Sequence, residues 1–163
     1  MKSSTPDPLI SVIIPTYNRA DLLVRSLESL ALQSIHTDQF EVVVIDDGST
    51  DSTREVCKKF NKKLSINYQR QENSGISAAK NMGIFVSKGK LLLFFDDDDV
   101  ADKNLLKEHI STHTSNPEET VAVLGYTTWH PSLTITHVMN FVTDIGQFLF
   151  SYSNLKDGQA QRN

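Results

Sequence analysis

Short apolar runs and helical stripes alternate along the chain up to about residue 125. Five runs rich in large apolar residues have the length of strands: 9–14, 40–45, 64–69, 91–95 and 121–124. Between them, apolar residues recur at helical spacing, as in Leu23, Leu27 and Leu30. Runs with little polar alternation are typical of strands buried on both faces of a sheet. This order predicts an α/β fold with a mainly parallel, Rossmann-like sheet, helices on both faces and right-handed crossovers.

Local signals place the starts of two of these helices. Asn18 follows the first strand and is expected to cap the helix after it. The sequence Ser52-Thr53-Arg54-Glu55 has the pattern of a capping box before a second helix. Beyond Gly125 the pattern changes: residues 129–137 predict an edge strand or hairpin, and residues 141–152 predict a helix.

Composition narrows the class of protein. The chain has 163 residues and a formal net charge of −4, which argues against a nucleic-acid-binding protein. Its single cysteine, Cys57, cannot form an internal disulfide and is expected to be a packed apolar residue. We find no transmembrane segment of roughly 18 apolar residues and no signal peptide in the first eight residues, so a cytoplasmic location is expected, or a peripheral one at the membrane.

Polar residues follow three of the predicted strands. Positions 15–18, 46–49 and 96–99 come directly after apolar runs. Ligands bind at the carboxyl ends of the strands in open parallel sheets, and these ends meet at one edge. We therefore expect the three groups to converge.

Four consecutive aspartates follow the most apolar run. Asp96 and Asp98 have D-x-D spacing, so in an extended chain their side chains leave the same face. Neighbouring carboxylates repel each other unless a cation lies between them, and Mg²⁺ or Mn²⁺ suits such oxygen ligands. The alternative is a solvated acidic loop in which Asp99 or Asp102 caps the next helix. The metal site is favoured, because a cap needs only one acid.

The other groups leave two interpretations open. One of Asp46 and Asp47 is expected to belong to a turn, while the other could accept a hydrogen bond from a nucleobase. Tyr17 could stack on a base or pack beneath the first helix. Asn73-Ser74-Gly75 leads into a helix N-terminus suited to phosphate, with a plain turn and cap as the alternative. Arg19 and Lys80 are candidate counter-charges for a diphosphate.

Together, these residues resemble the motifs of family 2 glycosyltransferases with the GT-A fold. The series is Ser11–Asn18 (SVIIPTYN), Val44–Asp51 (VIDDGSTD), Asn73–Gly83 (NSGISAAKNMG) and Phe95–Asp99 (FDDDD). The order and spacing match over roughly residues 9–115. The resemblance implies inverting sugar transfer from a nucleotide-sugar donor, UDP- or dTDP-linked, to a sugar or glycan acceptor, with Mn²⁺ or Mg²⁺ on the diphosphate.

The resemblance also implies roles for individual residues. By motif position, the nucleotide would contact Pro15, Thr16, Tyr17, Asp47, Gly75, Lys80, Asp96 and Asp97. The nucleoside pocket would be lined by the first three, and the base would meet Asp47. The metal would be held by Asp98, with Asp96 helping. Lys80 stands where the family normally has an arginine, which replaces a forked donor by a point charge of the same sign.

The same resemblance implies a division of the chain. We expect a flexible N-terminus at 1–8, a nucleotide-sugar-binding GT-A subdomain at 9–127, the start of an acceptor subdomain at 128–152 and a polar tail at 153–163. No catalytic base is recognisable; Asp144 is the only interior candidate after the aspartates, and its position is more typical of a helix surface. The chain is therefore expected to be a donor-binding fragment, with an exposed apolar face that favours self-association.

Two other functions remain open. The chain could be a non-catalytic nucleotide-sugar-binding module. Residues 96–100 also fit the D-x-D-x-[TV] motif of haloacid-dehalogenase-like phosphatases, but those enzymes normally begin with the strand that carries this motif, and here it is the fourth.

Overall fold

A four-stranded parallel sheet forms the centre of the first of two compact units in this protein. The computed structural model describes residues 7–145, and its units divide between Val121 and Ala122. The strands are β1 (Ile10–Thr16), β2 (Phe40–Asp46), β3 (Ile66–Arg70) and β4 (Leu91–Phe94). They lie in the order β3-β2-β1-β4, and every pair is parallel. The predicted α/β class and parallel sheet are confirmed.

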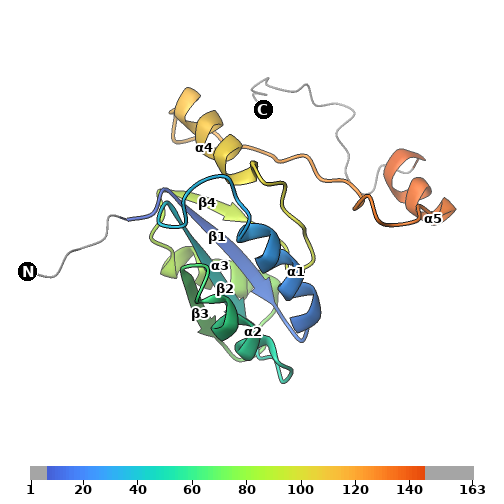
Figure 1. The fold of residues 1–163 in the computed structure, drawn as a ribbon, viewed down its shortest axis with the longest axis horizontal. Helices are drawn as coiled ribbons and strands as arrows, with labels where there is room; N and C mark the ends of the chain where they lie inside the picture. Colours follow the sequence, from blue (N-terminus) through green and yellow to red (C-terminus); the bar gives the residue numbers. More distant parts are fainter. Residues whose placement is uncertain (1–6, 146–163) are drawn as a thin grey trace, which may run out of the picture. The chain divides into compact units, whose positions relative to one another are not determined.

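Helices cover both faces of the sheet. They are α1 (Ala20–Leu30), α2 (Thr53–Phe60), α3 (Ile76–Val86) and α4 (Leu105–Ser115). The chain moves from β1 to β2 to β3 in one direction and then returns past β1 to β4. Right-handed crossovers therefore place α1 and α2 on one face and α3 on the other, as Figure 1 shows.

The core explains why the apolar runs show so little alternation. All residues of β1 and β2 are buried. One face packs against the α1 stripe of Leu23, Leu27 and Leu30, as predicted, and the other packs against α3. Gly83 allows α3 to approach closely, because a Cβ there would lie 2.3 Å from Cγ2 of Ile13.

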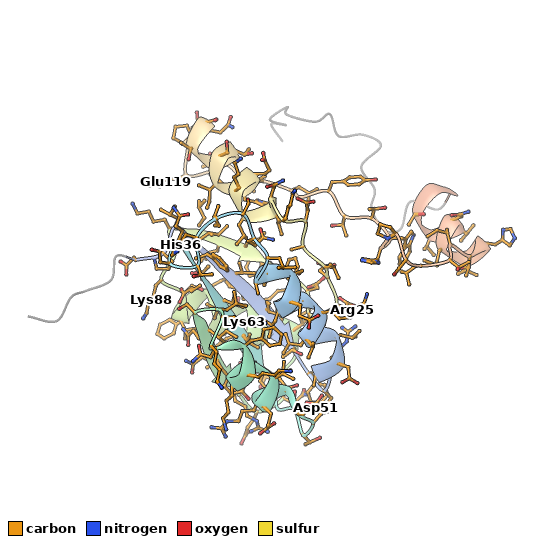
Figure 2. The ribbon with its side chains drawn as sticks, in the orientation of Figure 1. Arg25, His36, Asp51, Lys63, Lys88 and Glu119 are labelled. Carbon is orange, nitrogen blue, oxygen red and sulfur yellow. The ribbon has the colours of Figure 1, made fainter. Side chains whose placement is uncertain are left out.

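The helix starts differ from the local prediction. Asn18 does not cap α1; its backbone is left-handed, with φ of 52°. Asp51, in the loop before α2 (Figure 2), instead accepts hydrogen bonds from the N–H groups of Ala20 at 2.9 Å and Thr53 at 3.0 Å. No capping-box hydrogen bond forms at Ser52. One carboxylate thus serves two helices, which a pattern within one segment does not reveal.

The second unit contains no strand within its described residues. Its regular elements there are α5 (His137–Asn140) and a π-helical turn (Phe141–Ile145). The predictions of a strand at 121–124 and of a hairpin at 129–137 are therefore wrong. A strand is stable only with a hydrogen-bonded neighbour and a buried face, and Leu124, Leu133 and Ile135 are exposed. The predicted helix at 141–152 begins earlier, at His137, and positions 146–152 and the 153–163 tail lie outside the described residues.

Residues 7–145 contain no helix that is both long enough and apolar enough to cross a membrane.

Candidate functional site

The candidate site lies at the carboxyl end of β1. This strand lies between β2 and β4, and the chain reverses its direction across the sheet between them. Such a switch point is where open α/β sheets bind ligands. Thr16 ends β1, and its hydroxyl donates a 2.8 Å hydrogen bond to Oδ2 of Asp97, which follows β4. The carbonyl of Thr16 also accepts the N–H of Asp47 at 2.9 Å, so the three predicted groups meet at this point.

The aspartates form a turn. The N–H of Asp99 donates to the carbonyl of Asp96 at 3.2 Å, so the expected extended geometry is wrong. Behind the turn, the Ser26 hydroxyl of α1 contacts the carbonyls of Asp97 and Asp99, at 2.8 and 2.7 Å. The carboxylates consequently have separate surroundings: Asp97 is buried, while the side chains of Asp96 and Asp98 are 60% and 47% exposed.

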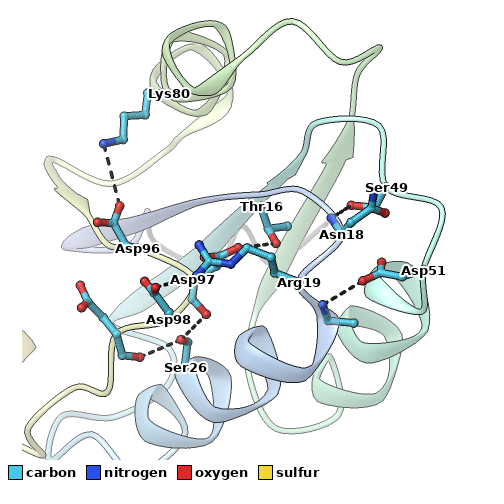
Figure 3. Close-up of polar contacts among 12 residues, drawn as sticks. Thr16, Asn18, Arg19, Ser26, Ser49, Asp51, Lys80, Asp96, Asp97 and Asp98 are labelled. Carbon is cyan, nitrogen blue, oxygen red and sulfur yellow. Dashed lines mark hydrogen bonds and ion pairs between the residues drawn. The ribbon is translucent and has the colours of Figure 1, made fainter. Parts of the chain in front are cut away.

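Arg19 connects two of these carboxylates. Its Nη1 donates to Asp97 at 2.8 Å, and its Nη2 donates to Asp98 at 2.7 Å (Figure 3). The hydrogen bond to Asp98 raises the pKa of Arg19 against the effect of burial, so the group stays charged. Burial raises the pKa of Asp97, and the Thr16 hydroxyl and the Arg19 charge offset this only in part. The guanidinium thus neutralises a buried acid and reaches an exposed one.

Lys80 approaches the turn from α3. Its Nζ lies 4.0 Å from Oδ1 of Asp96 and 5.7 Å from the ring centre of Phe94. Figure 3 shows Lys80 reaching the aspartate turn from α3, and Arg19 reaching it from the position just before α1. Each exposed carboxylate therefore faces one cation.

Asp47 organises the loop before α3. Its Oδ1 accepts hydrogen bonds from the Gln71 side chain at 2.7 Å and the Ser74 N–H at 2.9 Å, and its Oδ2 accepts one from the Gly75 N–H at 2.9 Å. Burial opposes ionisation, but these donors outweigh it and lower the pKa of Asp47. A carboxylate offers about four acceptor positions, so one on Oδ2 remains for a ligand.

Gly75 leaves space beside that carboxylate. Its φ of 87° favours glycine, and a Cβ built there would meet no atom within 4 Å. A ligand can therefore approach the backbone at the N-terminus of α3 closely, as the phosphate interpretation requires.

The remaining sequence candidates take distinct positions. Asp46 is the turn residue of its pair, because it is buried and accepts from the Ser49 N–H at 2.7 Å and from the Tyr68 hydroxyl. Pro15 is buried within β1. Tyr17 is 47% exposed, which argues against packing beneath α1 and leaves its ring available to a base.

The donor set suits a hard divalent ion that a substrate also binds. Residues 7–145 contain no group of three or more His, Cys, Asp or Glu side chains placed to hold a metal by themselves. Mg²⁺ commonly takes only one or two carboxylates and completes its shell with water and substrate phosphates. Asp98 and Asp96 present exposed carboxylate oxygens of this kind, so the residues fit.

Sequence reasoning missed Ser26, which holds the aspartate turn. The available signal was a serine between Leu23 and Leu27 in an apolar stripe, where a buried hydroxyl needs a partner.

The sequence profile of glycosyl transferase family 2 matches residues 11–158. The chain belongs to this family. Relatives of this family 2 chain include the validoxylamine A glucosyltransferase of Streptomyces hygroscopicus subsp. jinggangensis, 42% identical over 120 residues. That match covers 72% of this chain and 28% of the relative.

Solved structures agree with the family. Staphylococcus aureus TarS 1–349 in complex with UDP-GlcNAc superposes with a TM-score of 0.64 and 30% identity, over 72% of this chain and 37% of that one. The mannosyltransferase PcManGT from Pyrobaculum calidifontis, in complex with GDP-Man and Mn²⁺, gives a TM-score of 0.61 and 27% identity, over 72% of this chain and 34% of that one. Membership of family 2 replaces the haloacid-dehalogenase-like alternative.

Proposed function

We propose that this family 2 chain binds the nucleotide-sugar donor of an inverting glycosyltransferase, in a complex with Mn²⁺ or Mg²⁺. The observation that carries the proposal is the pair of exposed carboxylates, Asp96 and Asp98, at the β1–β4 switch point. Solved relatives hold UDP-GlcNAc, or GDP-Man with Mn²⁺, and both superpose over 72% of this chain. These two findings support a donor with a diphosphate bound at the aspartate turn.

Different residues of the chain would bind the base and the diphosphate of the donor. The open Oδ2 position of Asp47 would accept an N–H of a uracil or thymine base, and exposed Tyr17 would stack on it. The N-terminus of α3 at Gly75, together with Lys80, would stabilise the diphosphate charge. UDP- and dTDP-sugars share the base edge that Asp47 would contact, so either donor fits.

Asp98, helped by Asp96, would hold the divalent ion, and Asp97 or Asp96 would contact the ribose. When bound, the ion supplies Lewis-acid stabilisation of the negative charge that forms on the departing diphosphate. The structure places Thr16 and Arg19 on Asp97, and we propose that they keep this carboxylate in position beneath the donor. The chain thereby binds and orients the leaving group.

A sugar or glycan acceptor and a catalytic base complete the proposed reaction. Residues 9–127 would form the donor-binding part and residues 128–152 the start of the acceptor part. The chain spans 28% of the length of the validoxylamine A glucosyltransferase that it matches, and no residue described here is assigned as the base.

Calorimetric titration of UDP into the 163-residue chain, with and without Mn²⁺, tests the proposal. Mn²⁺ should tighten UDP binding at least tenfold, which is about 1.4 kcal/mol. Asp98→Ala should remove this gain, because it deletes one of the two exposed carboxylates. Asp102→Ala, which removes an exposed carboxylate outside the proposed site, is the matched control and should keep it.

The proposal fails if neither Mn²⁺ nor Mg²⁺ tightens UDP binding in the folded protein. It also fails if Asp98→Ala behaves like its control. Metal-dependent UDP binding without sugar transfer to any acceptor would favour the non-catalytic binding module.

A further inference from the structure

Arg19 forms an ion pair with Asp98, the carboxylate that would hold the proposed metal. Its two terminal nitrogens bind different aspartates, Asp97 through Nη1 at 2.8 Å and Asp98 through Nη2 at 2.7 Å. The two contacts differ in environment: the side chain of Asp97 is 5% exposed and that of Asp98 is 47% exposed. The contact with Asp97 therefore lies inside the protein, whereas the contact with Asp98 is open to exchange with a ligand.

Asp97, the buried partner of Arg19, is held in place by other hydrogen bonds as well. Asp97 also accepts the Thr16 hydroxyl, and its carbonyl accepts the Ser26 hydroxyl. Leaving a buried carboxylate without its cation is costly. Arg19 is therefore expected to keep Asp97 in every state of the site.

The second contact can be exchanged at low cost. Asp98 is half-exposed, so water can replace Arg19 there, and an ion pair at such a position contributes little. A guanidinium also binds phosphate oxygens with the same fork that it uses for carboxylates. A diphosphate arriving beside the turn thus offers Nη2 an alternative anion.

We propose that Arg19 couples metal binding to nucleotide binding at this site. Without nucleotide, Nη2 of Arg19 holds Asp98 and competes with a divalent ion for that carboxylate. With a nucleoside diphosphate present, Nη2 transfers to a phosphate oxygen while Nη1 stays on Asp97, and Asp98 is freed. The inference rests on the proposed function, since it assumes that Asp98 is a metal ligand.

Arg19→Lys is the informative variant, because it keeps the charge and removes the fork. A single ammonium is expected to stay with buried Asp97 and leave exposed Asp98 free. Arg25→Lys is the matched control: Arg25 is exposed on α1, the helix that begins directly after Arg19 (Figure 2), and the substitution is identical.

The measurement is the Kd of Mn²⁺ for the full 163-residue chain, without and with saturating UDP. A half-exposed ion pair contributes up to about 1 kcal/mol, which is about fivefold in an equilibrium constant. Arg19→Lys should bind Mn²⁺ about fivefold more tightly than the wild type when UDP is absent. The factor by which UDP tightens Mn²⁺ binding should fall by about the same amount, while Arg25→Lys should match the wild type.

Two failures are distinguishable. If UDP does not tighten Mn²⁺ binding in the wild type, the proposed function fails. If it does, but Arg19→Lys and Arg25→Lys share the wild-type Kd without UDP, the coupling role of Arg19 is wrong. A general effect of charge is tested with Arg19→Gln and Arg25→Gln: equal gains in Mn²⁺ affinity would overturn the proposal.

A measurement on the wild type needs no variant to fold. Magnetic resonance of the arginine side chains should show a shifted Arg19 guanidinium signal when UDP is added with Mg²⁺. Mg²⁺ alone at the same concentration should leave it in place. An Arg19 signal that UDP with Mg²⁺ does not move would overturn the proposal.

Discussion

Asp47→Asn should destabilise the first unit by removing a charged acceptor from the loop before α3. Asp47 accepts three hydrogen bonds, from Gln71, Ser74 and Gly75, and is only 6% exposed. An asparagine of the same shape keeps one oxygen and turns an amide N–H₂ toward the N–H of Gly75. One hydrogen bond is lost, and the other two now have a neutral acceptor.

The magnitude follows from the kinds of bond involved. Hydrogen bonds to charged groups contribute about 1.5–3 kcal/mol and neutral ones about 0.5–1.5 kcal/mol. The sum is reduced because asparagine avoids the cost of burying a charge. We expect a loss of about 2 kcal/mol at pH 7, or a Tm lower by about 8 °C for a unit of roughly this size.

Urea unfolding followed by circular dichroism at 222 nm is the assay. The only tryptophan, Trp129, belongs to the second unit, so dichroism is chosen to follow the helices of the first. Among residues 7–145, the four longer helices α1–α4 belong to the first unit, and the difference between wild type and variant isolates the contribution of Asp47.

Acid pH gives a second, independent check. The pKa of Asp47 is lowered in the folded protein: burial raises it, but the bonds from Ser74, Gln71 and Gly75 prevail. Its stabilisation is therefore present above the unfolded pKa of about 3.9 and is lost as pH falls through the lower folded value. The gap between wild type and Asp47→Asn should narrow on acidification. Equal stability at pH 7, or a gap that does not narrow, would refute the role assigned to Asp47.

Three further predictions concern the scaffold. Gly83→Ala should cost about 1–3 kcal/mol in urea unfolding, because its Cβ would meet Cγ2 of Ile13 at 2.3 Å; an unchanged midpoint would show that α3 does not pack so closely. Ser26→Ala should cost about 1–3 kcal/mol and weaken metal-dependent UDP binding, since the carbonyls of Asp97 and Asp99 lose their donor; unchanged binding would contradict the support role of Ser26. Burial raises the pKa of the Cys57 thiol to about 12, so a thiol reagent at pH 8 should react only at the rate of unfolding; rapid reaction in the native protein would be inconsistent with this.

The parts of the fold that depend on local periodicity and on the order of elements along the chain could be predicted. Strands β1 and β2, the Leu23–Leu27–Leu30 stripe of α1 and the faces of the helices follow from apolar spacing and the right-handed crossover rule. The second unit could not be predicted in this way. Its apolar residues, such as Leu133 and Ile135, resemble strand residues in the sequence, but the described residues provide no neighbouring strand.

The candidate site, too, could be predicted only in part. By itself, the sequence determined which chemical groups gather at the carboxyl edge of the sheet, because motif order and strand direction place residues 15–18, 46–49 and 96–99 there. Only the tertiary structure decided which group each carboxylate faces. Arg19 and Thr16 reach Asp97 across 78 and 81 residues of sequence, and Asp47 serves a loop 24 to 28 residues away. Periodicity reports the face of an element on which a side chain lies, whereas hydrogen-bond partners depend on how separate elements pack.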